Sequence, residues 1–188
     1  MSLASYSKPY QEGQRNRELT KQGESINFFK YHHYYAGKSQ IAQISLEFEK
    51  EVFIFFMKEL GPKLPFDVCL GVPENRGTGI SLPRNICKLL SEENISLKDG
   101  FEGVSKTRDG VIIKNIPYDE RPVKVAGLYS IDRNKMPVPK FGFLVIDDVF
   151  ETGSTVSGLC KTLESEYPGV PRYIIALTHL RATERLAK

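Results

Sequence analysis

The stretch between Phe143 and Thr155 constrains the fold of this chain more than any other part of the sequence. Four apolar residues lead into two adjacent carboxylates, Asp147 and Asp148. An apolar run of this kind predicts a buried strand over residues 143–149. The apolar spacing that follows predicts a helix over residues 154–166. The short turn between these two elements contains small hydroxyl residues and a glycine: Thr152, Gly153, Ser154 and Thr155.

This turn has the composition of a phosphate-binding site. The first turn of a helix carries unpaired N–H groups and the positive end of the macrodipole, so it binds a phosphate without any arginine. Gly153 lets the backbone approach the phosphate closely, and the hydroxyls beside it add donors. Asp147 and Asp148 are suited to accept hydrogen bonds from two vicinal sugar hydroxyls. The segment therefore predicts a site for a ribose 5-phosphate.

Each half of the segment has a simpler interpretation. A lone Asp-Asp pair is usually a solvated turn, and a lone Thr-Gly-Ser-Thr sequence is usually a helix cap. The five fixed letters of D-D-x-x-x-T-G-x-T would occur together by chance in a chain of this length roughly once in ten thousand, at average residue usage. The combination favours the functional interpretation.

Alternating strands and helices indicate the α/β class. The clearest further elements are strands over residues 68–72 and 173–180 and a helix over residues 82–93. This order predicts a mainly parallel twisted sheet flanked by helices, with ligands bound where strand carboxyl ends meet helix amino ends. Residues 98–124 are polar and contain several glycines and prolines, so we expect a long mobile loop with a hairpin in it.

The beginning of the chain divides into a tail and the first part of the domain. Residues 1–24 are polar without a period and predict a loose tail or arm, so the domain is expected to span residues 25–188. Within it, an aromatic run at residues 26–35 favours a short strand. Helical spacing of apolar residues extends over residues 39–60.

Composition narrows the class of protein. The 188 residues fit one domain, and the formal net charge of +3 suits a partner that is a polyanionic small molecule without itself indicating nucleic acid, which stays open. The sequence shows no signal peptide and no apolar run of about 18 residues, so we expect a cytoplasmic protein with no membrane partner.

The three cysteines show no C-x-x-C spacing that would favour a zinc site. Cys69 and Cys87 lie in apolar runs and are expected to be reduced core residues. The alternative, a disulfide, requires an oxidising compartment.

The segment at residues 147–155 resembles the phosphoribosyl-pyrophosphate-binding signature of the type I phosphoribosyltransferases. The resemblance implies the type I phosphoribosyltransferase fold. In it, Asp147 and Asp148 hold the ribose 2- and 3-hydroxyls, and a Mg²⁺ ion bridges the pyrophosphate and the sugar hydroxyls, with the two carboxylates as possible metal contacts. The residues that would wrap the 5-phosphate are Glu151, Thr152, Gly153, Ser154 and Thr155.

Glu151 stands where the hypoxanthine-guanine members of that family carry an acid. The resemblance therefore implies a catalytic role, in which Glu151 donates or accepts a proton at a base nitrogen. The alternative is a helix-terminus carboxylate that is stabilised by the dipole.

Two further segments are similar to loops of the family. One is the pyrophosphate loop, which would comprise Pro73, Glu74, Asn75, Arg76 and Gly77 and whose backbone amides and arginine suit a diphosphate. The other is a flexible loop that closes over the active site and would contain Lys106, Thr107 and Arg108. An ordinary strand-to-helix turn and a solvated run of charge are the respective alternatives.

A narrower likeness follows these loops. Arg121 and residues 125–129 resemble the competence-protein-F-like branch of the family. That branch usually carries an N-terminal zinc module with cysteine ligands, and this chain does not have those cysteines.

The resemblance implies a homodimeric enzyme that uses phosphoribosyl pyrophosphate and Mg²⁺. It would transfer the 5-phosphoribosyl group to a nitrogenous base or amine and release pyrophosphate. The alternative is a non-catalytic protein of the same fold that senses phosphoribosyl pyrophosphate or a nucleotide. Release of pyrophosphate in the presence of a pool of bases discriminates between the two.

Overall fold

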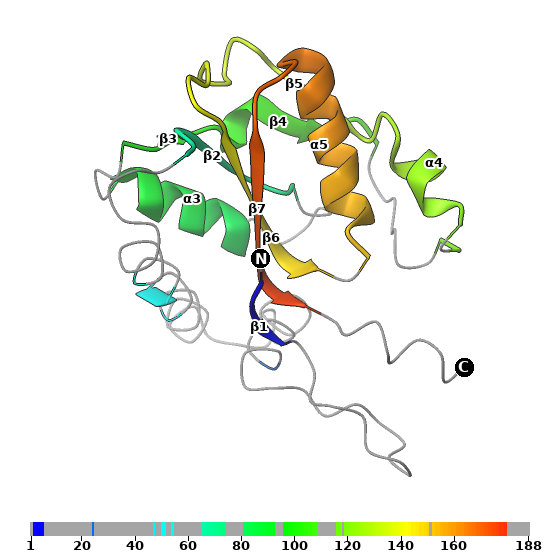
Figure 1. Ribbon diagram of the computed structural model, residues 1–188. Coiled ribbons are helices and arrows are strands. Elements are labelled where there is room, and N and C mark those ends of the chain that lie inside the picture. The colour runs from blue at the N-terminus through cyan, green and yellow to red at the C-terminus, as the bar shows by residue number, and fades with distance from the viewer. Residues whose placement is uncertain are drawn as a thin grey trace.

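A computed structural model describes most of the chain after residue 65. The described residues are 2–5, 24, 47, 50, 51, 54, 65–73, 81–92, 96–108, 116, 117, 119–150 and 152–179. Among them, five strands form one sheet in the order β1-β7-β6-β2-β3, and every pair of neighbours is parallel (Figure 1). The strands are β1 (Ser2–Ser5), β2 (Val68–Gly71), β3 (Lys98–Asp99), β6 (Phe143–Phe150) and β7 (Arg172–His179). The predicted α/β class with a mainly parallel sheet is confirmed.

Helices and a small antiparallel pair complete the described structure. The helices are α3 (Leu82–Glu92), the short α4 (Arg121–Val125), α5 (Ser154–Glu166) and the 3-10 turn η2 (Phe101–Gly103). Strands β4 (Val104–Lys106) and β5 (Tyr129–Ile131) pair with each other and lie outside the main sheet. The predicted strands at β2, β6 and β7 and the predicted helices at α3 and α5 are all present, with ends within one residue of the prediction.

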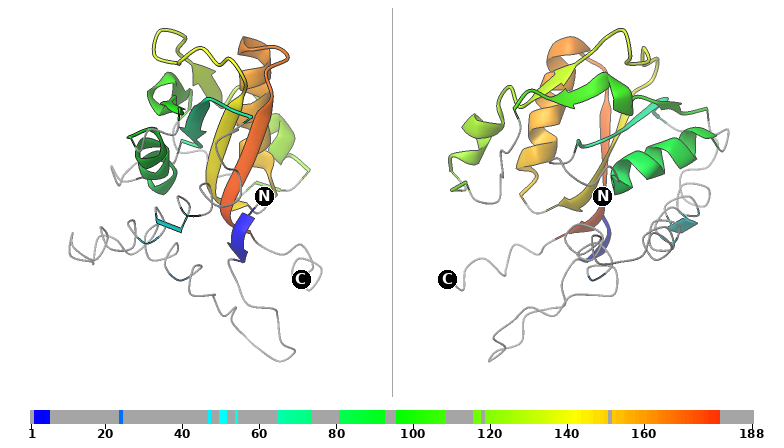
Figure 2. Two further views of the ribbon diagram at one scale, coloured as in Figure 1. Left: turned by 60° about the vertical axis from the view of Figure 1, so that its left-hand side comes forward. Right: turned by 180° about the vertical axis from the view of Figure 1, so that it is seen from behind.

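The two long helices cover opposite faces of the sheet (Figure 2, left). On one face, α3 buries Leu82, Ile86, Cys87 and Leu90, and the Cys69 thiol of β2 donates a hydrogen bond to the Cys87 carbonyl at 3.5 Å. On the other face lies a core cluster to which the sheet, α5 and the β4–β5 pair all contribute. The apolar runs are continuous because both faces of the central strands are buried.

The strand order places a topological switch point between β2 and β6. From β2 the chain passes through α3 to β3 on one side, whereas β6 lies on the other side of β2 and leads through α5 to β7. Crossovers in opposite directions put their helices on opposite faces because both crossovers are right-handed. A crevice outside the carboxyl ends of the two central strands is the usual place for a ligand in such a sheet.

The prediction of a long loop at residues 98–124 was wrong for its first part. Residues 98–106 contain β3, η2 and β4, and Arg121 begins α4. Gly100 and Gly103 favoured a loop in the prediction because glycines are common in loops. Both instead lie where the chain packs tightly against Met136, and a Cβ on Gly103 would lie 2.8 Å from the Met136 Cα. The glycines are there for close packing, and the strands are too short to show an alternating pattern. The apolar stretch at residues 111–113 lies outside the described residues.

The sequence did not predict β1, which pairs with β7 from Ser2↔Ala176 to Ser5↔His179. Of the helix predicted at residues 39–60, Glu47, Lys50, Glu51 and Ile54 are helical and exposed. The other residues of that segment, the strand predicted at residues 26–35 and most of the tail lie outside the described residues.

Two further findings bear on the expectations from composition. Cys69 and Cys87 are free and buried, as predicted, and Cys160 is free and half-buried. No helix in the described part of the chain has the length and apolar content needed to cross a membrane.

Candidate functional site

The carboxyl ends of β2 and β6 lie side by side at the switch point. The register pairs Gly71 with Ile146, and the backbone N–H of Val72 donates to the Ile146 carbonyl at 2.8 Å. Pro73, the first residue of the predicted pyrophosphate loop, is buried directly after this contact. The two segments that the sequence assigned to one ligand therefore start from adjacent strands.

The amino end of α3 approaches the same edge of the sheet. A Cβ on Gly71 would lie 2.7 Å from the Pro83 Cβ and 3.1 Å from the Arg84 backbone nitrogen. Glycine is therefore required here, because any larger residue would push the first turn of α3 away from the strand. The amino ends of α3 and α5 both follow strands at the carboxyl edge, and their macrodipoles direct positive potential toward it.

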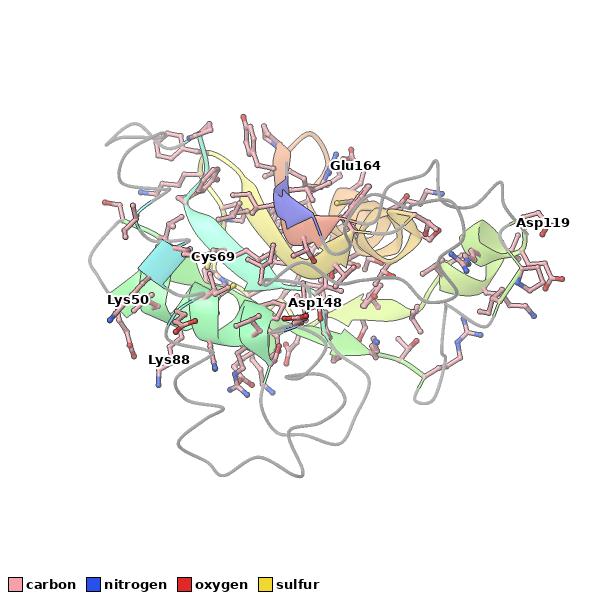
Figure 3. The ribbon with its side chains drawn as sticks, turned by 90° about the horizontal axis from the view of Figure 1, so that it is seen from below. Lys50, Cys69, Lys88, Asp119, Asp148 and Glu164 are labelled. Atoms are coloured by element: carbon pink, nitrogen blue, oxygen red, sulfur yellow. The ribbon has the colours of Figure 1, made fainter. Side chains whose placement is uncertain are left out.

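Asp147 and Asp148 lie at the carboxyl end of β6 and are both buried, with 8% and 6% of their surface exposed. The backbone N–H of Asp148 donates to Asp147 Oδ1 at 3.0 Å, and the Thr178 hydroxyl of β7 donates to the Asp148 carbonyl at 3.1 Å. Figure 3 views the carboxyl edge of the sheet from below, with Asp148 near its centre and Asp119 at the periphery. Both carboxylates belong to one strand end, where two buried acidic side chains lie next to each other in the chain.

The turn after β6 has the geometry of an anion-binding helix start. Gly153 has φ 71°, in the left-handed region that favours glycine, and α5 begins at Ser154, as predicted. The Ser154 N–H donates to the Thr152 hydroxyl oxygen at 3.2 Å, and the Thr152 hydroxyl donates to the Ser154 Oγ at 2.8 Å. The N-cap residue Gly153 has no side chain that could cap the helix, so the amino end of α5 is suited to an anion.

A groove with a volume of about 500 Å³ begins at this turn and follows α5. One wall is the face of α5 that carries Ser154, Ser157, Lys161 and Ser165, and the other is residues 125–127 at the end of α4. Tyr129 of β5 lines the groove together with Thr152, Gly153 and Ser154. The groove thus extends the predicted phosphate turn into a space in which six of the thirteen lining residues carry a hydroxyl group.

Sequence reasoning did not identify Tyr129 as a site residue. It is 3% exposed, and its hydroxyl makes no hydrogen bond within the described structure. Burial raises the pKa of the Tyr129 hydroxyl, and the negative charge of Asp147 raises it further. A single tyrosine at the end of a short apolar run carries no signal for such a position, because its place depends on the pairing of β5 with β4.

The predicted flexible-loop residues are at the end of β4. Lys106 pairs with Tyr129 in the antiparallel register. The Thr107 hydroxyl donates to the Gly127 carbonyl at 2.7 Å, and Arg108 Nη2 donates to the Ala126 carbonyl at 3.1 Å. These two contacts fasten the loop to the same residues that form one wall of the groove.

Five of the predicted site residues lie outside the described part of the chain: Glu74, Asn75, Arg76, Gly77 and Glu151. Their assigned roles stay predictions from the sequence. Asp147, Asp148, Thr152, Gly153, Ser154 and Thr155 are described and lie together around the end of β6 and the start of α5.

The donor set fits a magnesium ion that is held mainly by its ligand. Among the described residues, no group of three or more His, Cys, Asp or Glu side chains could hold a metal ion by itself. Mg²⁺ usually keeps several waters and binds through one or two carboxylates together with substrate phosphates. The pair Asp147 and Asp148 supplies those carboxylates.

Comparisons of this chain with models of known protein families and with curated proteins give no match.

Proposed function

We propose that this protein is a phosphoribosyltransferase of the type I fold that uses phosphoribosyl pyrophosphate and Mg²⁺. The observation that carries the proposal is the position of the buried Asp147–Asp148 pair, one short turn before the start of α5, where the N-cap Gly153 is in the left-handed conformation. This arrangement, at the switch point of a parallel sheet, suits a sugar whose hydroxyls and 5-phosphate are bound within a few ångströms of each other.

In the proposed reaction, a nitrogen lone pair of the acceptor attacks C1 of the ribose. The bond between C1 and the pyrophosphate oxygen breaks, and its electron pair leaves with the pyrophosphate. The acceptor nitrogen then loses its proton if it carries one. Positive charge develops on the sugar ring in the transition state, and the two buried carboxylates stabilise that charge because they lie close to it in a medium of low dielectric constant.

The other residues have supporting roles in this proposal. Thr152, Gly153, Ser154 and Thr155 hold the 5-phosphate, and the loop that starts at Pro73 receives the pyrophosphate beside the strand end of β6. A bound Mg²⁺ would neutralise charge on the leaving pyrophosphate. Glu151 would transfer a proton at the acceptor nitrogen.

The test combines turnover with binding. The protein is incubated with phosphoribosyl pyrophosphate, Mg²⁺ and a pool of nucleobases and amines, and pyrophosphate release is measured beside calorimetric titration of phosphoribosyl pyrophosphate. We expect binding and base-dependent release. The double variant Asp147→Asn with Asp148→Asn should lose the binding, whereas Asp119→Asn with Asp132→Asn, which removes two exposed carboxylates, should keep it.

Each result has a defined meaning. Unchanged affinity in the Asp147/Asp148 double variant, with the fold intact by circular dichroism, would contradict the assigned sugar site. Binding of phosphoribosyl pyrophosphate without release of pyrophosphate for any acceptor would support the sensor instead of the enzyme.

A further inference from the structure

The hydroxyl group of Tyr129 is buried and forms no hydrogen bond in the described structure. The side chain is 3% exposed, and its oxygen is inaccessible to solvent and has no hydrogen-bond partner there. Leaving a buried polar group unpaired costs about 1–3 kcal/mol. Such groups are rare in folded proteins, and each one calls for an explanation.

The position of Tyr129 suggests what that explanation is. Its side chain lines the groove that Thr152, Gly153 and Ser154 also line, and the charge of Asp147 acts on its hydroxyl. The tyrosine is therefore near the predicted phosphate turn and near Asp147, one of the predicted sugar-hydroxyl acceptors. These belong to β6 and α5, whereas Tyr129 belongs to the separate β4–β5 pair.

We propose that the Tyr129 hydroxyl binds the ligand, donating a hydrogen bond to a phosphate oxygen of the sugar phosphate held at the Thr152–Ser154 turn. This inference rests on the proposed function and adds a contact from a third element to its phosphate site. Asp147 is not the hydroxyl's partner in the described structure. A phosphate bound at the amino end of α5 is the kind of acceptor that the Tyr129 hydroxyl lacks.

The electrostatic setting suits a donor. A tyrosine hydroxyl has an ordinary pKa of about 10, and burial raises the pKa of Tyr129, so the hydroxyl keeps its proton at neutral pH. It can therefore donate to a phosphate without adding negative charge beside it. A hydrogen bond to a charged group contributes about 1.5–3 kcal/mol, which is at least about a tenfold change in affinity.

The experiment is Tyr129→Phe, with Tyr173→Phe as the matched control. Tyr173 is in β7, is 38% exposed and packs against Phe66 at a ring-centroid distance of 5.5 Å, away from the groove lining. Affinities for phosphoribosyl pyrophosphate, ribose 5-phosphate and inorganic phosphate are measured by calorimetry, and thermal unfolding is measured without ligand. We expect Tyr129→Phe to weaken ribose 5-phosphate at least about tenfold and the control to leave it unchanged.

Unfolding without ligand gives an independent readout. Because the deleted hydroxyl has no partner, Tyr129→Phe should unfold at the same temperature as the wild type or slightly higher. A clear loss of stability would overturn the inference, since it would mean that the hydroxyl serves the fold.

The ligand series separates this inference from the proposed function. If the wild type binds ribose 5-phosphate and Tyr129→Phe binds it equally well, only the inference fails. If the wild type binds inorganic phosphate more tightly than Tyr129→Phe does, but binds neither sugar phosphate, the proposed function fails and Tyr129 is still an anion-binding residue. If the wild type binds none of the three, both fail.

Discussion

The carboxylate of Asp67, just before β2, accepts a hydrogen bond at 2.9 Å from the backbone N–H of Phe141, just before β6. It also accepts hydrogen bonds from the N–H groups of Lys140 and Gly142. This one side chain fixes the amino ends of the two central strands to each other, while the Val72–Ile146 contact joins their carboxyl ends. The alignment of the two strand ends at the candidate site depends on both sets of hydrogen bonds.

The first prediction concerns the hydrogen bonds that Asp67 accepts and the dependence of their stabilising effect on pH. Burial alone would raise the pKa of Asp67, but hydrogen bonds from Phe141, Lys140 and Gly142 and the charge of Lys98 outweigh it, so the pKa lies below its usual value. A lowered pKa stabilises the fold above the unfolded value of about 4. That contribution is lost as pH falls through the folded pKa.

Asp67→Asn should therefore lower the free energy of unfolding by about 2 kcal/mol at neutral pH, on the scale of hydrogen bonds to a charged group. The difference from the wild type should begin to shrink below about pH 4, where the carboxyl of the unfolded chain takes up a proton, and should be lost once pH falls below the folded pKa. Urea unfolding at several pH values measures it. Asp119→Asn, at an exposed position, should change stability by less than about 0.5 kcal/mol. If the difference in the free energy of unfolding does not change with pH, the charge of the Asp67 carboxylate does not stabilise the fold.

The second prediction concerns the phosphate turn. Gly153→Ala places a side chain at φ 71°, with its Cβ 2.8 Å from the Phe150 ring. Gly169→Ala is the matched control, because Gly169 has φ 75° and nothing within 4 Å of its Cβ. Both variants should lose about 1–2 kcal/mol of stability from the left-handed conformation. Only Gly153→Ala should also weaken ribose 5-phosphate, by at least about tenfold, and equal affinities in the two variants would remove Gly153 from the site.

The third prediction concerns Glu151, which follows β6 in the sequence. If Glu151 transfers a proton to or from the acceptor, Glu151→Gln should keep ligand affinity and lower turnover by roughly a hundredfold or more. If it is only a carboxylate near a phosphate, the variant should bind the phosphate slightly more tightly with unchanged turnover, because two like charges no longer repel each other. Steady-state kinetics and a titration on the same variant decide between the two.

The fourth prediction concerns the β4–β5 pair. The end of β4 is held by its short pairing with β5 and by contacts of Thr107 and Arg108 with residues 126 and 127. Amide hydrogen exchange there should be faster than in β6 and β7 in the free protein. It should slow when phosphoribosyl pyrophosphate and Mg²⁺ bind, if this segment closes over the ligand. Slow exchange that does not respond to the ligand would refute the closure.

The sequence predicted the central part of the fold because its signals there are long. β6 has an unbroken apolar run, and α5 has apolar residues at helical spacing that continue to Leu163. β3, β4 and β5 have only two or three residues each, too few for a period to be recognised. β1 pairs with the last strand of the sheet, and no local pattern reports a partner so distant in the sequence.

The candidate site likewise contains residues that the sequence could predict and residues that only the tertiary structure places there. Asp147, Asp148 and the turn at Thr152–Ser154 are close together in the sequence, so the sequence alone predicted that they lie together. Tyr129 reaches the same place only through the register that pairs it with Lys106 and through the packing of β5 against α5. The groove along α5 is likewise a product of tertiary packing, since its second wall comes from the end of α4.

The switch point between β2 and β6 has a consequence for how the protein acquires its ligand. The strands are neighbours in the sheet but far apart in the sequence, and β3, β4, α4 and β5 all lie between them along the chain. No short fragment of the chain contains both halves of the crevice, so a partly folded molecule offers the ligand only a fraction of its contacts. A ligand that contacts both strand ends would bind only the completed fold, and it would stabilise that fold by RT ln(1 + [L]/Kd), which rises with the ligand concentration.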